Sequence, residues 1–83
     1  MITKTTTLAE LFNIAVSAID EVTTGEIFIV RDLFRGFEWA RISRGVRTQL
    51  GSMIFAYANG ATGAFVIEPL DKTAQNQQKY KKL

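Results

Sequence analysis

The chain has 83 residues, 47% of them hydrophobic, with six Phe, two Tyr and one Trp, which suffices for one small domain with a filled core. It contains no Cys and no His, which excludes disulfides and thiolate metal sites and removes imidazole acid–base chemistry. Its formal net charge of +2 is divided unevenly, with a balance of −3 over residues 1–34 and +5 over residues 35–83, so we expect one basic face.

The first predicted element is an amphipathic helix from Leu8 to Val22. Residues 1–6 are expected to be a flexible start, and Thr7 and Glu10 have the spacing of a capping box. Apolar residues then recur at helical spacing opposite an acidic face, which argues against membrane binding. Gly25 suits the C-terminal stop because glycine tolerates positive φ.

The next segment combines a short strand with a broken helix. Residues 26–30 are β-branched and aromatic, which predicts a strand. Asp32 is placed to cap the next element, a helical segment over residues 33–42 that breaks near Gly36. We expect Trp39 in the core or at its edge; the alternative is an exposed Trp that stacks on a base.

A long helix from Ser43 to Asn59 comes next, with Ser43 as its N-cap. Phe55 makes the C-terminal end apolar nearly all round, so we expect it to be buried. Gly51 costs helix stability, and we expect close approach to another helix, or to DNA, to compensate. The apolar stripe of this helix consists of Val46, Leu50, Met53, Ile54 and Tyr57.

The C-terminal segment predicts a hairpin. Residues 64–67 form an apolar strand, residues 68–78 a polar turn, and residues 78–82 a Lys-rich returning strand with Tyr80 inward. Together with residues 26–30 these strands can form one small antiparallel sheet. We therefore predict an α+β fold over residues 1–83, a winged helix-turn-helix with three helices and a three-stranded antiparallel sheet.

Residue patterns typical of catalysis are missing. A nucleophilic triad needs His or a Lys base beside Ser or Cys, and the glycines of residues 60–63 form a turn rather than a phosphate-binding loop. Glu26, Asp32 and Glu38 are acidic enough for Mg²⁺, but scattered carboxylates are normally surface groups. We expect no enzyme activity, no catalytic residue, no cofactor and no metal site.

The basic residues near the long helix and in the hairpin indicate contacts with nucleic acid. Arg41, Arg44 and Arg47 recur every three residues, from where they can reach phosphates, and Arg44 or Arg47 can reach a guanine edge. The polar turn suits backbone or minor-groove contacts; the alternative is a solvated turn and lysines that only keep the chain soluble. The predicted binding residues are Arg41, Arg44, Arg47, Thr48, Lys72, Gln75, Asn76, Gln77 and Lys79.

A set of residues in the second half carries a resemblance. The set consists of Asp32-Leu33-Phe34, Trp39, Arg47, Leu50-Gly51, Phe55, Lys72-Thr73, Asn76-Gln77 and Tyr80. It resembles small bacterial winged-helix proteins, many of them uncharacterised and some carried by phages and mobile elements. The resemblance covers residues 27–82 and implies a winged-helix fold. In those proteins a basic residue often comes after Leu-Gly, but Ser52 stands there in this chain, which argues against a base or phosphate contact at that position.

We therefore expect a non-enzymatic protein that binds nucleic acid, with duplex DNA as the expected ligand and regulation of transcription as the role. The alternative is a protein–protein interaction module: a homodimer formed through the first helix, or an adaptor or phage-type inhibitor of a host protein. No secretory signal is apparent and no apolar run approaches the ~20 residues of a membrane span, so a cytoplasmic location without a membrane partner is expected.

Overall fold

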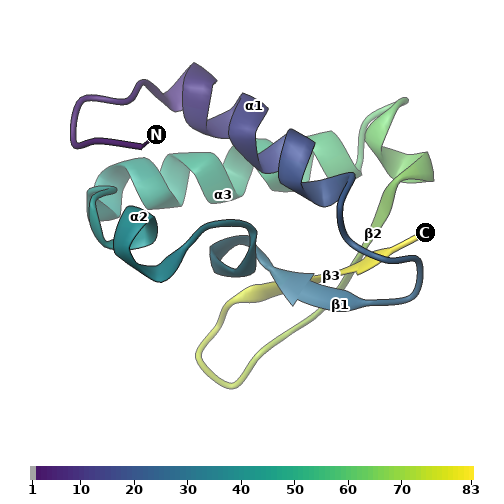
Figure 1. Cartoon of the computed structure of the whole chain (residues 1–83). Helices are drawn as coiled ribbons and strands as arrows, with labels where there is room; N and C mark the ends of the chain where they lie inside the picture. Colours follow the sequence, from purple (N-terminus) through teal and green to yellow (C-terminus); the bar gives the residue numbers. More distant parts are fainter. Residues whose placement is uncertain (1) are drawn as a thin grey trace.

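The structure, a computed structural model, describes residues 2–83. Its helices are α1 (Leu8–Ile19), α2 (Gly36–Ala40) and α3 (Arg44–Ala58). Its strands are β1 (Ile27–Ile29), β2 (Ile67–Lys72) and β3 (Gln78–Lys82), and two 3₁₀ turns are η1 (Val30–Leu33) and η2 (Gly63–Phe65). The helices α1 and α3 lie against each other on one side of the sheet, and the β2–β3 hairpin projects beyond them (Figure 1).

The capping box of α1 is confirmed. The backbone N–H of Glu10 donates to Thr7 Oγ1 at 3.2 Å, and the N–H of Thr7 donates to Glu10 Oε1 at 3.3 Å. The helix ends at Ile19 rather than Val22, because the Lys82 ammonium donates to the Ile19 carbonyl at 2.9 Å. Gly25 has a φ of 92°, but it lies in the later turn toward β1 and not at the helix stop.

The segment between β1 and α3 differs from the prediction at Asp32. Its carboxylate accepts from the backbone N–H of Ile29 at 3.0 Å, so it caps the 3₁₀ turn η1 to which it belongs. The expected cap of the following helix is therefore wrong: α2 starts after Arg35, whose side chain makes no capping hydrogen bond. Trp39 is half-buried at the core edge, with its ring centroid 5.6 Å from that of Phe34.

The core lies between α1, α3 and the sheet. Ser43 caps α3 as predicted, its Oγ accepting from the N–H of Val46 at 3.4 Å. Leu50 and Ile54 from the predicted stripe are fully buried. The predicted burial of Phe55 is wrong, because this side chain is 46% exposed. Each residue turns about 100° around a helix, so Phe55 faces away from the side on which Ile54 meets the core.

The three-stranded antiparallel sheet is confirmed, with strand order β1-β3-β2. Phe28, Tyr80 and Pro69 are neighbours across the three strands. The predicted strand over residues 64–67 is wrong: η2 occupies its first half, and β2 starts at Ile67 and continues into the expected turn. Pro69 is tolerated there because β2 is an edge strand, where a missing N–H leaves no ladder bond unmade.

The N-terminal segment is attached to the core through Ile2. This side chain is 1% exposed, and its carbonyl accepts from Arg41 Nη1 at 2.8 Å. The backbone N–H of Ile2 donates to Glu38 Oε2 at 3.1 Å. The expected flexible start, residues 1–6, is therefore held to the core at its second residue. Met1 lies outside the described residues. Among residues 2–83 no helix has the length and apolar character needed to cross a membrane.

Candidate nucleic-acid interface

A groove of about 530 Å³ separates α3 from the β2–β3 hairpin. One wall is the outward face of α3, the other is the hairpin, and the end of β1 with η1 and Trp39 closes one end. We call this hollow the basic groove. Five of the predicted binding residues line it: Arg47, Thr48, Lys72, Asn76 and Gln77.

The α3 wall consists of residues that recur every three or four positions, which places them on one face of the helix. Arg47, Gly51 and Phe55 form one row along this face, and Thr48 and Ser52 form the next. Thr48 Oγ1 donates back to the Arg44 carbonyl at 3.1 Å, so this hydroxyl retains only its capacity to accept a hydrogen bond.

Gly51 is the one residue of the α3 wall that has no side chain. A Cβ built on it meets no side chain and no other segment of the described chain within 4 Å, its two chain neighbours and its own helix backbone aside. The expected close approach to another helix is therefore wrong: the glycine faces the open groove.

Arg47 is held in place by Trp39. Its Nη2 donates to the Trp39 carbonyl at 2.8 Å, and its guanidinium carbon lies 4.9 Å from the centre of the indole ring. The Nε–H of the same side chain is buried and finds no acceptor among residues 2–83. Arg47 therefore supports the fold with one nitrogen and offers an unused donor with another.

The hairpin turn is set by Thr73 and Asn76. The N–H of Asn76 donates to the Thr73 carbonyl at 2.9 Å, and the N–H of Gln77 donates to Thr73 Oγ1 at 3.1 Å. Asn76 has a φ of 64°, the left-handed residue that closes a three-residue hairpin loop. This turn places Lys72 and Gln77 on the groove side and leaves Gln75 exposed at the tip.

Tyr80 lines the inner end of the groove from the central strand. As predicted it points inward, with an exposed fraction of 0% and its ring stacked on Phe28 at 5.8 Å. Within the described chain its hydroxyl has no hydrogen-bond partner. Burial raises the pKa of Tyr80 to about 12, so the phenol stays protonated at neutral pH and presents an O–H donor.

The charge around the groove is of one sign. Arg31, Arg47 and Lys72 line it, and none of its described lining residues is acidic. Arg31 was not among the predicted binding residues because it lies in the acidic half of the sequence. The pairing of β1 with β3 brings it beside the hairpin, and no local pattern predicts that proximity.

Four predicted binding residues lie outside the lining of the groove. Gln75 is at the hairpin tip, and Arg44 is exposed one helical turn before Arg47 and Thr48, so it extends the same face. Arg41 donates to the Ile2 carbonyl and covers the Phe37 ring at 5.1 Å, which holds it against the N-terminal segment. Lys79 is next to the inward Tyr80 on β3, so it lies on the opposite face of the sheet.

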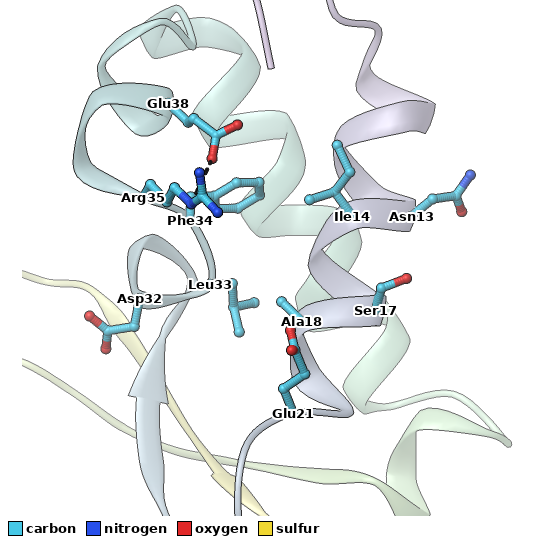
Figure 2. Close-up of a pocket in the computed structure, with 10 residues that line it drawn as sticks. All are labelled: Asn13, Ile14, Ser17, Ala18, Glu21, Asp32, Leu33, Phe34, Arg35 and Glu38. Atoms are coloured by element: carbon cyan, nitrogen blue, oxygen red, sulfur yellow. Dashed lines mark ion pairs between the residues drawn. The ribbon is translucent and has the colours of Figure 1, made fainter. Parts of the chain in front are cut away.

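A second hollow of about 600 Å³ lies between α1 and the η1–α2 segment. Figure 2 shows the apolar side chains Ile14, Ala18 and Leu33 in it, with the Glu21 carboxylate beside Ala18 and those of Asp32 and Glu38 farther out. We call it the acidic cleft. Glu38, whose side chain is only 15% exposed, lies 3.9 Å from the exposed Arg35 guanidinium, and residues 2–83 contain no acidic cluster that could hold a metal ion.

The comparisons with known proteins identify a family. No curated protein and no solved structure gives a significant match to the chain. A family model described as "Domain of unknown function (DUF1413)" matches residues 13–82, which include all three strands, α2, α3 and most of α1. The chain therefore belongs to the DUF1413 family.

Proposed function

We propose that this chain is a winged-helix protein that binds nucleic acid in a regulatory role and without catalysis, with duplex DNA as its ligand. The observation that carries the proposal is the basic groove, which collects Arg31, Arg47 and Lys72 between a helix and a hairpin without an acidic neighbour in its described lining. Phosphate contacts supply most of the affinity of such surfaces, and carboxylates in the same place would oppose them.

The order of the elements supports the winged-helix assignment. The chain runs α1, β1, α2, α3 and then the β2–β3 hairpin, with α3 beside the hairpin as a recognition helix lies beside its wing. The first two turns of α3 present Arg44, Arg47 and Thr48 on one face. A duplex would meet this face and the hairpin tip together, which makes Arg44 and Gln75 contacts at the rim.

The test is a titration of labelled duplex DNA, monitored by fluorescence anisotropy, at salt concentrations from about 50 to 200 mM. Three phosphate contacts predict an affinity loss of about 40-fold over this range. Lys72→Ala should weaken binding and reduce the salt slope by about one. Lys81→Ala is the matched control, because Lys81 carries the same charge on the opposite face of the sheet.

Two results would contradict the proposal. One is an absence of binding at 50 mM salt by a folded protein, as judged by circular dichroism. The other is an equal loss for Lys72→Ala and Lys81→Ala, because net charge alone would then account for the binding and the groove would have no part in it.

A second candidate function is a protein–protein interaction module, and the acidic cleft favours it. Ile14 of α1 is 37% exposed and lines this cleft together with Leu33 and Glu38 (Figure 2). An exposed apolar centre with acidic edges is suited to a basic partner or a second copy of the chain. Light scattering tests the dimer: Ile14→Asp should convert a dimer to a monomer, and a wild-type monomer at all concentrations excludes it.

A further inference from the structure

We infer that the basic groove holds an unpaired nucleotide, with the base stacked on Phe55 and the phosphate at the Arg47 end. The inference rests on the proposed function, because it assumes that nucleic acid reaches this surface. It goes further by naming what enters the groove: a single nucleotide that is not base-paired, at a strand end or next to a duplex.

The wall of the basic groove contributed by α3 contains a row of three residues, Arg47, Gly51 and Phe55. Side chains four residues apart lie on the same face of a helix, so Gly51 and Phe55 are neighbours along the groove wall. Because no side chain is present at Gly51, and a Cβ there would meet no side chain and no other segment of the described chain within 4 Å, that side of the Phe55 ring is left open to the groove. Phe55 is 46% exposed, although burial would be the favourable state of such a ring in water.

Two buried hydrogen-bond donors, the Tyr80 hydroxyl and the Arg47 Nε–H, have no acceptor among the described residues. The Tyr80 hydroxyl is fully buried, lines the groove and has no partner among the described residues. The Nε–H of Arg47 is likewise buried and has no hydrogen-bond partner among the described residues. Buried donors without partners are rare in folded proteins and cost free energy, so each needs an explanation. A ligand oxygen that accepts from either of them would provide one.

The positive charge and the volume of the basic groove indicate what kind of ligand fits it. With Arg31, Arg47 and Lys72 in the lining and no carboxylate among the described lining residues, the oxygen that enters is one of an anion. The groove volume of about 530 Å³ lies within the range of small-ligand sites. An anion joined to a flat apolar ring fits a phosphate at one end and an aromatic stacking surface at the other, which describes a nucleotide.

The exposed ring indicates an unpaired base rather than a paired one. In a duplex the two faces of each base are covered by its neighbours, so a wall of the groove reaches only phosphates and base edges. Base–aromatic stacking needs an uncovered face and tolerates any base. Asn76 and Gln77 stand on the opposite wall, where their amides can meet the edge of the stacked base.

The experiment compares a blunt labelled duplex with the same duplex carrying a single-stranded thymidine tail of about four nucleotides, a length at the lower end of single-strand sites. Two signals report binding: anisotropy of the label, and fluorescence of Trp39, the chain's one tryptophan, which lies in the groove lining. We expect the tailed duplex to bind about 10-fold more tightly and to quench Trp39.

Phe55→Ala should remove this advantage, measured as the ratio of the affinities for the tailed and the blunt duplex. Phe65→Ala is the matched control, because Phe65 is 83% exposed and lies in η2, outside the groove lining. Tyr80→Phe should weaken binding of the tailed duplex several-fold while the protein remains folded. Gly51→Leu should have the same effect by filling the open side of the Phe55 ring.

The failures are distinguishable. Equal affinity for the blunt and tailed duplexes, or an equal loss for Phe55→Ala and Phe65→Ala, overturns the inference and leaves the proposed function intact. Binding of neither duplex at low salt overturns the proposed function and the inference with it. A loss in Phe55→Ala that is equal for the blunt and the tailed duplex also overturns the inference, because the ring would then contact paired DNA.

Discussion

At the scale of the residue, Tyr80 combines full burial with a hydroxyl that has no partner within the described chain. Its ring fills the space between Phe28 and the helices, a role that phenylalanine would fulfil equally well. A buried hydroxyl without a partner is a cost to stability, so Tyr80→Phe is expected to be neutral or stabilising at pH 7. The hydroxyl is therefore better explained by a ligand than by the fold.

Burial raises the pKa of Tyr80 from 10.0 to about 12, which predicts a pH-dependent stability. Between these values the unfolded tyrosine has lost its proton and the folded one retains it. Below about pH 10 both states keep the proton, and the free energy of unfolding is at its full value. As the pH rises from about 10 to about 12, it falls by at most about 1.4 kcal/mol per pH unit. Urea unfolding at several alkaline pH values measures this loss, and Tyr80→Phe should reduce it. An identical slope in the variant would contradict the burial argument.

Single side chains also explain which basic residues are free to bind. Arg41, Arg47 and Lys82 donate to the backbone carbonyls of Ile2, Trp39 and Ile19. Arg41 links the N-terminal segment to the end of α2 and Lys82 caps the end of α1, so these two stabilise the fold rather than a complex, whereas Arg47 also lines the basic groove. The basic charge of the sequence therefore overstates the charge available to nucleic acid.

At the scale of the element, the β2–β3 hairpin depends on a left-handed residue. Asn76 has a φ of 64°, which costs most residues about 1–2 kcal/mol and glycine almost nothing. Asn76→Ala should lower the free energy of unfolding by about 1 kcal/mol, and Asn76→Gly should not. Gln75→Ala, at the exposed neighbouring position, is the control and should change it by less than about 0.5 kcal/mol. Equal unfolding midpoints for Asn76→Ala and Gln75→Ala in urea would exclude this role.

The elements differ in how far local sequence predicts them. The caps of α1 and α3 depend on residues three positions apart, Thr7 with Glu10 and Ser43 with Val46, so the sequence alone predicts both. The start of β2 cannot be read from local pattern. Residues 64–67 have the apolar character of a strand, but the pairing register with β3 begins at Ile67 opposite Lys82, and the residues before it form η2.

At the scale of the whole molecule, η1 and α2 separate two hollows of opposite charge. Arg31 and Trp39 line the basic groove, whereas Asp32 and Glu38 line the acidic cleft on the other side of the same segment. This arrangement would orient an approaching polyanion toward α3 and the hairpin and away from α1. The radius of gyration, 12.1 Å, matches the value of about 12 Å expected for a compact fold of this length.

The N-terminal segment packs against the core through Ile2, and a substitution at this position tests how much that packing stabilises the fold. Its side chain is 1% exposed in the core, so Ile2→Ala should lower the free energy of unfolding by about 2–4 kcal/mol through lost burial and a residual cavity. Lys4→Ala, at an exposed position in the same segment, should change it by less than about 0.5 kcal/mol. Thermal unfolding measures both. A loss below about 0.5 kcal/mol in Ile2→Ala would mean that this segment is loose, as its sequence suggests.

Composition and residues a few positions apart were enough to predict the α+β class, the caps of α1 and α3, the inward Tyr80 and the absence of thiol and imidazole side chains. Only the tertiary structure decided that Phe55 is exposed, that Gly51 faces open space and that Arg31 joins Arg47 and Lys72. Each of these depends on which face of one element meets another, a choice made by packing over the whole chain rather than by local pattern.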